Sequence, residues 1–145
     1  MRKTKLALTA LAVTTGAAIL LTGCSTVEDA LHKEKRSTYE NLTAFDDDSG
    51  IDATWLPEDA SGIEIIRSTQ ADDAAIALES SADLSSELCA PVERQSAPAY
   101  QPGPEVDVFK ISDAFACGDW TVVETGYGWL GWSPAHPDEK AQSPS

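Results

Sequence analysis

Hydrophobic and polar positions alternate in two pairs of neighbouring segments, and each pair predicts an antiparallel β-hairpin. Residues 63–67 are β-branched and partly alternating, and residues 74–79 place an isoleucine and a leucine on one face after an Ala-Asp-Asp turn. Residues 120–125 alternate clearly, and residues 129–132 return after a Gly-Tyr-Gly turn. We therefore expect one hairpin in each half of the folded region.

The region between the two hairpins predicts a short helix and an irregular loop. Ser80 to Asp83 offers helix caps, residues 84–89 carry leucines at i and i+4, and Pro91 blocks any continuation. Residues 95–105 are rich in proline and read as a loop, and residues 106–111 suggest another strand. These elements predict a small single α+β domain over residues 55–133, built from two antiparallel β-hairpins and a short helix.

The flanks of this domain are polar. Residues 24–54 are highly charged and have few apolar positions, which predicts an acidic tether with a short helix near residues 27–35. Residues 134–145 are polar and proline-rich, which predicts a disordered tail.

The first 23 residues have the composition of an export signal. Three positive charges lie in the first five residues, and an uncharged apolar stretch runs from Leu6 to Thr22. The stretch ends in Leu21-Thr22-Gly23-Cys24, which resembles the lipobox of bacterial lipoproteins. The alternative is an uncleaved transmembrane helix, for which the stretch is short and interrupted by threonine and glycine.

The resemblance implies that Cys24 receives a diacylglycerol on its thiol and that cleavage occurs before it. Two acyl chains hold a protein stably on a bilayer. The membrane is then a partner through Cys24, and the protein lies on the extracytoplasmic face of the cell membrane. The segments Trp-Leu-Pro-Glu-Asp-Ala at 55–60 and Cys-Gly-Asp-Trp at 117–120 are also similar to small actinobacterial lipoproteins of unassigned role, and this second resemblance implies no activity.

Three cysteines are present, and lipid on Cys24 leaves Cys89 and Cys117. An even pair in an oxidising compartment predicts a disulfide. The bond would close a loop of 28 residues, which the chain-entropy estimate equates with about 3.5 kcal/mol of stabilisation. The alternative is a reactive or metal-binding cysteine, although neither residue has a histidine or a Cys-x-x-Cys motif nearby.

Charge narrows the classes of partner. The formal net charge of the whole chain is −14. Removing Arg2, Lys3 and Lys5 from the ten basic residues leaves seven against 24 acidic residues, a formal net charge of −17 for the mature chain. Such a surface repels nucleic acid, so we expect no nucleic-acid partner.

The chain carries few groups for catalysis. His32 lies in the predicted tether and His136 in the predicted tail, and no P-loop, dinucleotide or Gly-x-Ser-x-Gly motif occurs. We predict no enzyme, no cofactor and no metal site. Paired carboxylates leave a small glycan-acting enzyme as a minor alternative.

Aromatic residues gather near the C-terminal end of the predicted domain. Trp120, Tyr127, Trp129 and Trp132 lie within 13 positions. In one interpretation they fill the core and rim of a small domain, with Trp132 facing solvent. In the other, Tyr127, Trp129 and Trp132 bind a cell-wall glycan or a protein. The leading hypothesis is a non-catalytic, membrane-anchored interaction or envelope module, and the competing one is a carbohydrate-binding module.

Overall fold

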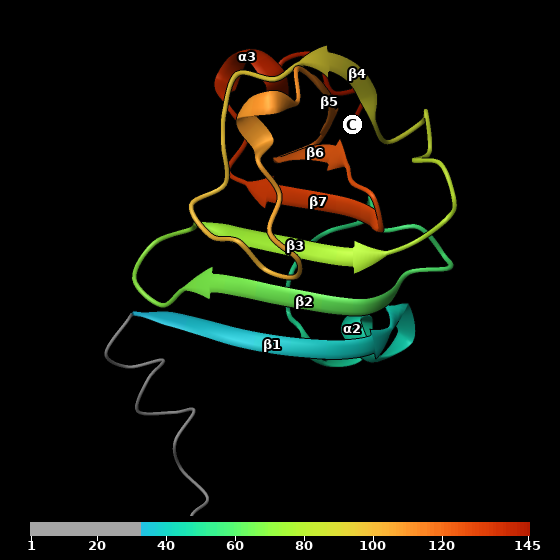
Figure 1. Ribbon diagram of the computed structural model, residues 1–145, viewed down its shortest axis with the longest axis vertical. Coiled ribbons are helices and arrows are strands. Elements are labelled where there is room, and N and C mark those ends of the chain that lie inside the picture. The colour runs from blue at the N-terminus through green and yellow to red at the C-terminus, as the bar shows by residue number, and fades with distance from the viewer. Residues whose placement is uncertain (1–32) are drawn as a thin grey trace, which may run out of the picture.

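The computed structural model describes residues 33–145 and shows a single small domain built on one antiparallel sheet (Figure 1). Seven strands lie in the order β1-β2-β3-β7-β6-β5-β4. Every neighbouring pair is antiparallel. The strands are β1 (Glu34–Asn41), β2 (Ser61–Ser68), β3 (Ala74–Glu79), β4 (Ala90–Glu93), β5 (Asp113–Cys117), β6 (Trp120–Glu124) and β7 (Gly128–Ser133).

Helices are few and short in the described region. They are α2 (Leu42–Asp48), the 3-10 turn η1 (Val108–Lys110) and α3 (Pro137–Lys140). The domain is therefore mostly β. The predicted α+β class was too helical, because the segment expected to form the central helix does not form one.

Both predicted hairpins are confirmed. β2 pairs with β3, with Ile65 opposite Ile76, and β6 pairs with β7, with Val123 opposite Leu130. The hairpins join through β3 and β7, which pair along their whole length from Ala74 to Glu79. This junction puts both hairpins into one continuous sheet.

The predicted helix over residues 84–89 is wrong. The chain makes a single turn there, in which the Ser85 carbonyl accepts hydrogen bonds from the amides of Leu88 and Cys89. β4 begins at Ala90, and its pairing with β5 takes the chain out of the turn before a helix can propagate. The strand expected over residues 106–111 is also absent, because η1 occupies that position.

The predicted boundaries of the folded region were too narrow. Residues 34–48 form β1 and α2, so the expected tether over 24–54 is wrong for its described part. The expected disordered tail over 134–145 contains α3, whose Glu139 is fully buried. Cys24 and residues 27–32 of the expected short helix lie outside the described residues, and the rest of that helix overlaps the start of β1.

Both faces of the sheet are covered. One face packs under α2 and the segment after it, in a cluster that includes Phe45, Trp55, Ile76 and Trp129. The other packs under residues 94–112, which cross in front of β7 and β3 in Figure 1, in a cluster that includes Trp132. This double coverage explains why β6 and β7 are almost continuously buried.

Two glycines allow these covering segments to approach closely. A Cβ on Gly131 would lie 2.4 Å from the ring of Trp55, so the indole packs directly on the backbone of β7. A Cβ on Gly103 would lie 2.8 Å from that of Ala77, and Gly103 also has a positive φ of 67°. Each covering segment therefore packs closely on the sheet at a position where one of the two partners is a glycine.

The predicted disulfide is confirmed: Cys89 and Cys117 are bonded. The bond ties the turn before β4 to the end of β5, next to the pair Ala90 and Ala116. It therefore fastens the edge of the sheet that β4 forms.

Candidate functional site

A large open hollow, which we call the charged groove, lies at one end of the sheet and has a volume of about 790 Å³. Its floor is a row of residues that face one another across four strands. Lys35 lies opposite Arg67, Arg67 opposite Ala74, and Ala74 opposite Ser133. Directly opposed residues of antiparallel strands share one face of the sheet, so these four side chains form a continuous strip.

The walls of the charged groove come from segments far apart in the sequence. The segment from Gly50 to Trp55, the turn between β2 and β3, the turn between β5 and β6, and Lys140 of α3 all contribute. The indole of Trp120 donates a hydrogen bond of 2.8 Å to the carbonyl of Asp52, which fixes one wall to the end of β6. The hollow is thus a product of the whole fold rather than of one loop.

Charges of both signs line the charged groove. The cations are Lys35, Arg67 and Lys140, and the carboxylates are Asp52, Asp72, Asp73 and Asp119. Lys140 is ion-paired with Asp119. Lys35 and Arg67 form no ion pair with any carboxylate within residues 33–145. Within the same residues the Arg67 guanidinium makes a single side-chain hydrogen bond, a long one of 3.5 Å to the Ser49 carbonyl.

Lys35 and Arg67 are thus two adjacent cations that have no counter-ion within the described part of an acidic chain. They offer charge-assisted hydrogen bonds to an anionic group, while Asp72 and Asp73, in the turn between β2 and β3 that also lines the groove, suit a cationic group. The arrangement therefore fits a polar ligand that carries both signs of charge.

The predicted aromatic platform is not at the surface. Trp129 is 6% exposed and Trp132 is 2% exposed. The Trp129 indole donates to the Ala82 carbonyl at 3.1 Å, and its ring packs edge-on to Phe115. The expectation that Trp132 faces solvent is wrong, because residues 94–112 cover its face of the sheet.

Tyr127 packs against the buried cluster that contains Trp132, whereas Trp129 belongs to the cluster on the other face of the sheet, and Tyr127 also lines a second, more open hollow of about 610 Å³. Its hydroxyl is buried and has no hydrogen-bond partner within the described residues. This burial raises the pKa of the Tyr127 hydroxyl above its usual value. The three residues predicted as one binding surface are therefore not brought together as an accessible site.

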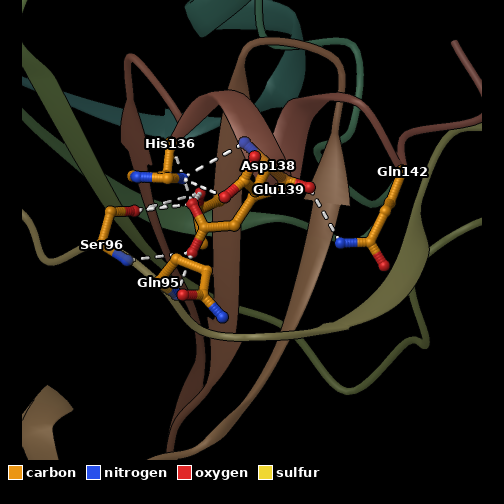
Figure 2. A network of polar contacts seen from close by, with 7 residues as sticks. Gln95, Ser96, His136, Asp138, Glu139 and Gln142 are labelled. Carbon is orange, nitrogen blue, oxygen red and sulfur yellow. Dashed lines mark hydrogen bonds and ion pairs between the residues drawn. The ribbon is translucent and has the colours of Figure 1, made fainter.

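Sequence reasoning missed a buried carboxylate. Glu139 of α3 is fully buried and faces the segment after β4 and the strand β6 (Figure 2). Its Oε1 accepts from the amides of Gln95 at 2.5 Å and Ser96 at 3.0 Å. Its Oε2 accepts from the Ser96 hydroxyl at 2.7 Å, the Thr121 hydroxyl at 2.6 Å and the His136 amide at 2.9 Å.

These five donors decide the ionisation of Glu139. Burial opposes the charged form, but the hydrogen bonds from Thr121, Gln95, Ser96 and His136 favour it more strongly, so the pKa of Glu139 is lowered. The Ser96 hydroxyl also accepts from the Trp132 indole at 2.9 Å, which extends the network into the core. We interpret Glu139 as a clamp that holds α3 and residues 95–96 on the sheet.

A sequence signal for this clamp exists. His136-Pro137-Asp138-Glu139 places proline at the first helical position and a glutamate three residues after the capping residue. In the structure the His136 imidazole accepts from the Asp138 amide at 3.2 Å, while Glu139 caps the His136 amide. His136 thus belongs to the folded domain, contrary to its predicted place in a disordered tail.

Residues 33–145 contain no group of three or more histidine, cysteine, aspartate or glutamate side chains arranged to hold a metal ion. None of the helices in that range is long and apolar enough to cross a membrane.

No protein-family model, curated protein or solved structure matches the chain.

Proposed function

We propose that the chain is a non-catalytic binding module, anchored through lipid on Cys24 to the extracytoplasmic face of a bacterial membrane. The lipobox Leu21-Thr22-Gly23-Cys24 supports the anchor. The bond between Cys89 and Cys117 supports export, because disulfides persist in oxidising compartments. The anchor then keeps the domain at the membrane surface, where it meets envelope components.

We further propose that the charged groove binds the ligand. The observation that carries this proposal is the pair Lys35 and Arg67, side by side on the groove floor and without a counter-ion among residues 33–145. Asp72 and Asp73 on the same rim complement a cationic end. A short peptide with free charges of both signs, from the cell wall or an envelope protein, has this chemistry.

The anchor is tested with the precursor. Wild-type protein and Cys24→Ala are produced with labelled fatty acid. We expect label and cleavage in the wild type, and an unlabelled, uncleaved precursor in Cys24→Ala. Label that persists in Cys24→Ala would exclude this anchor.

The groove is tested by calorimetric titration with two separate probes, free stem peptides of peptidoglycan and glycan strands stripped of peptide. We expect the peptides to bind, and Arg67→Gln and Lys35→Gln each to weaken binding at least about tenfold, since a charge-assisted hydrogen bond contributes roughly 1.5–3 kcal/mol and about 1.4 kcal/mol corresponds to tenfold. Lys110→Gln is the matched control, because Lys110 is highly exposed and lies outside the groove. Equal weakening by all three variants would contradict the assignment of the groove.

The carbohydrate alternative predicts binding of the stripped glycan strands instead. The burial of Trp129 and Trp132 argues against it, because stacking on a sugar ring needs an exposed aromatic face. The enzyme alternative predicts release of reducing sugar from the same strands. Asp72→Asn would have to abolish that release if a groove carboxylate were responsible.

A further inference from the structure

Among residues 33–145, the outer strand β1 presents an unpaired backbone edge. Within this range it pairs with β2 on one side only, and it stands at the end of the sheet in Figure 1. The carbonyl of Lys33 accepts from the amide of Thr69 at 2.9 Å, so the polar backbone groups of Lys33 point toward β2. Because these directions alternate along an antiparallel strand, the backbone groups of Glu34, Arg36, Thr38 and Glu40 point away from the sheet.

Three of these four residues, whose backbone groups point away from the sheet, have charged side chains. Arg36 is exposed, and its Nε and Nη2 bind Glu34 Oε1 at 3.1 Å and 2.9 Å, which leaves Nη1 free of any hydrogen bond within residues 33–145. Glu40 is exposed and has no hydrogen bond or ion pair within the same residues. Charges on an edge strand normally prevent another strand from pairing with it. In β1, however, the charges disfavour most alignments of the strand with a second copy of itself and favour one alignment.

Symmetry limits the registers available to two copies of β1. When two antiparallel strands are related by a two-fold axis, some residue must lie opposite its own copy. With Ser37 on the axis, Glu34 would face Glu40 of the second copy, and the two carboxylates would repel. With Lys35, Arg36 or Glu40 on the axis, that charged residue would face its own copy directly, and the like charges would repel.

The register centred on Thr38 is different. It places Arg36 opposite Glu40 of the second copy, and Glu40 opposite Arg36 of the second copy. With Tyr39 on the axis no opposite charges meet. Opposed residues share a face, so both ion pairs form on the same side of the joined sheet. In this register Arg36, Thr38 and Glu40 pair through their outward backbone groups, about six hydrogen bonds in all.

We propose that β1 is a self-association surface, through which two copies of this chain join their sheets in the register centred on Thr38, held by reciprocal Arg36–Glu40 ion pairs. This proposal goes beyond the ligand-binding function and does not depend on it. A single pair of strands makes a small interface, so association in dilute solution is weak. Two copies held on one membrane have a raised effective concentration, which favours the pair.

Cysteine cross-linking tests the register. The full mature chain is reconstituted in lipid vesicles, and Thr38→Cys is treated with a mild oxidant or a short bismaleimide. Thr38 meets its own copy on the axis, so we expect a cross-linked dimer. Asn41→Cys is the matched control on the same strand, since two copies of Asn41 would lie about 20 Å apart at 3.3 Å per residue. Equal cross-linking at both positions would overturn the register.

Charge exchange tests the ion pairs in the Thr38→Cys background. Arg36→Glu and Glu40→Arg each turn both attractive pairs into repulsive ones, so each alone is expected to lower dimer yield roughly tenfold. A mixture of the two variants restores attraction on both sides and is expected to recover the dimer. The double variant in one chain is expected to recover it as well. If the single variants cross-link like their parent, or the mixture does not recover, the proposal fails.

Discussion

Glu139→Gln is the sharpest test of how the domain holds together. The substitution keeps the shape of the side chain and replaces one carboxylate oxygen by an amide NH₂. The carboxylate accepts five hydrogen bonds in a fully buried site. An amide has one oxygen. It can replace either Oε1, which accepts two of the hydrogen bonds, or Oε2, which accepts the other three.

The least damaging orientation sets the expected cost. With the amide oxygen in place of Oε1, the amides of Gln95 and Ser96 keep their acceptor, and the hydroxyls of Ser96 and Thr121 can rotate to accept from the NH₂. The amide of His136 then faces a donor and is left unsatisfied. Losing charge-assisted hydrogen bonds and orphaning one donor costs about 3 kcal/mol. The oppositely oriented amide orphans two backbone donors and costs more.

The assay is guanidinium unfolding at neutral pH, followed by tryptophan fluorescence. With a typical slope of the unfolding free energy against guanidinium concentration, a loss of about 3 kcal/mol in stability lowers the unfolding midpoint by roughly 1 M. Asp138→Asn is the matched control, because the neighbouring carboxylate is 81% exposed and is expected to change stability by less than about 0.5 kcal/mol. If Glu139→Gln unfolds at the same midpoint as Asp138→Asn, the clamp does not exist.

Acid titration separates the charge of Glu139 from its shape. The folded pKa of Glu139 is depressed below its ordinary value of 4.5. Its stabilisation is therefore fully present above about pH 4.5 and is lost as the pH falls through the lower folded pKa. The stability gap between wild type and Glu139→Gln should narrow in that acidic range. A gap that stays constant to the lowest measurable pH would refute the role of the charge.

Two further predictions concern the packing of the sheet. Reducing the Cys89–Cys117 bond is expected to lower the free energy of unfolding by about 3.5 kcal/mol, measured by denaturation with and without reductant; an unchanged midpoint would contradict this. Gly131→Ala is expected to cost about 1–3 kcal/mol, because its Cβ would meet the Trp55 ring at 2.4 Å. Gly126→Ala is the control, with nothing within 4 Å of its Cβ, and equal midpoints for the two variants would refute the contact.

The hairpins could be predicted because their side chains alternate and their turns are explicit. In β6 and β7 the aromatic and β-branched residues are both periodic and buried, so local preference and tertiary packing agree. The disulfide could be predicted because lipid on Cys24 leaves two cysteines, Cys89 and Cys117, to pair with each other. Neither inference required knowledge of how distant segments meet.

The polar elements could not be predicted in the same way. β1 is an edge strand whose side chains are mostly charged or hydroxylated, so it resembles a tether in composition. It is ordered by backbone pairing with β2, which leaves no hydrophobic periodicity to detect. α3 was missed for a related reason, because its one buried side chain is the carboxylate of Glu139.

The candidate site illustrates the same limit. The expectation that Trp132 faces solvent failed because residues 95–105 read as an irregular loop, and nothing in that composition shows that the loop packs on the sheet. The charged groove depends on the register that sets Lys35 beside Arg67, and β1 had not been recognised as a strand. Sites formed across strands become visible only when the pairing is known.

The most direct measurement of the proposed anchor is the intact mass of the protein extracted from membranes, before and after reduction. We predict a chain that begins at Cys24, carries diacylglycerol, and gains the mass of two hydrogen atoms on reduction as the Cys89–Cys117 bond opens. A chain that still begins at Met1, or one that begins at Cys24 without lipid, would contradict the proposal of a lipid-anchored extracytoplasmic module.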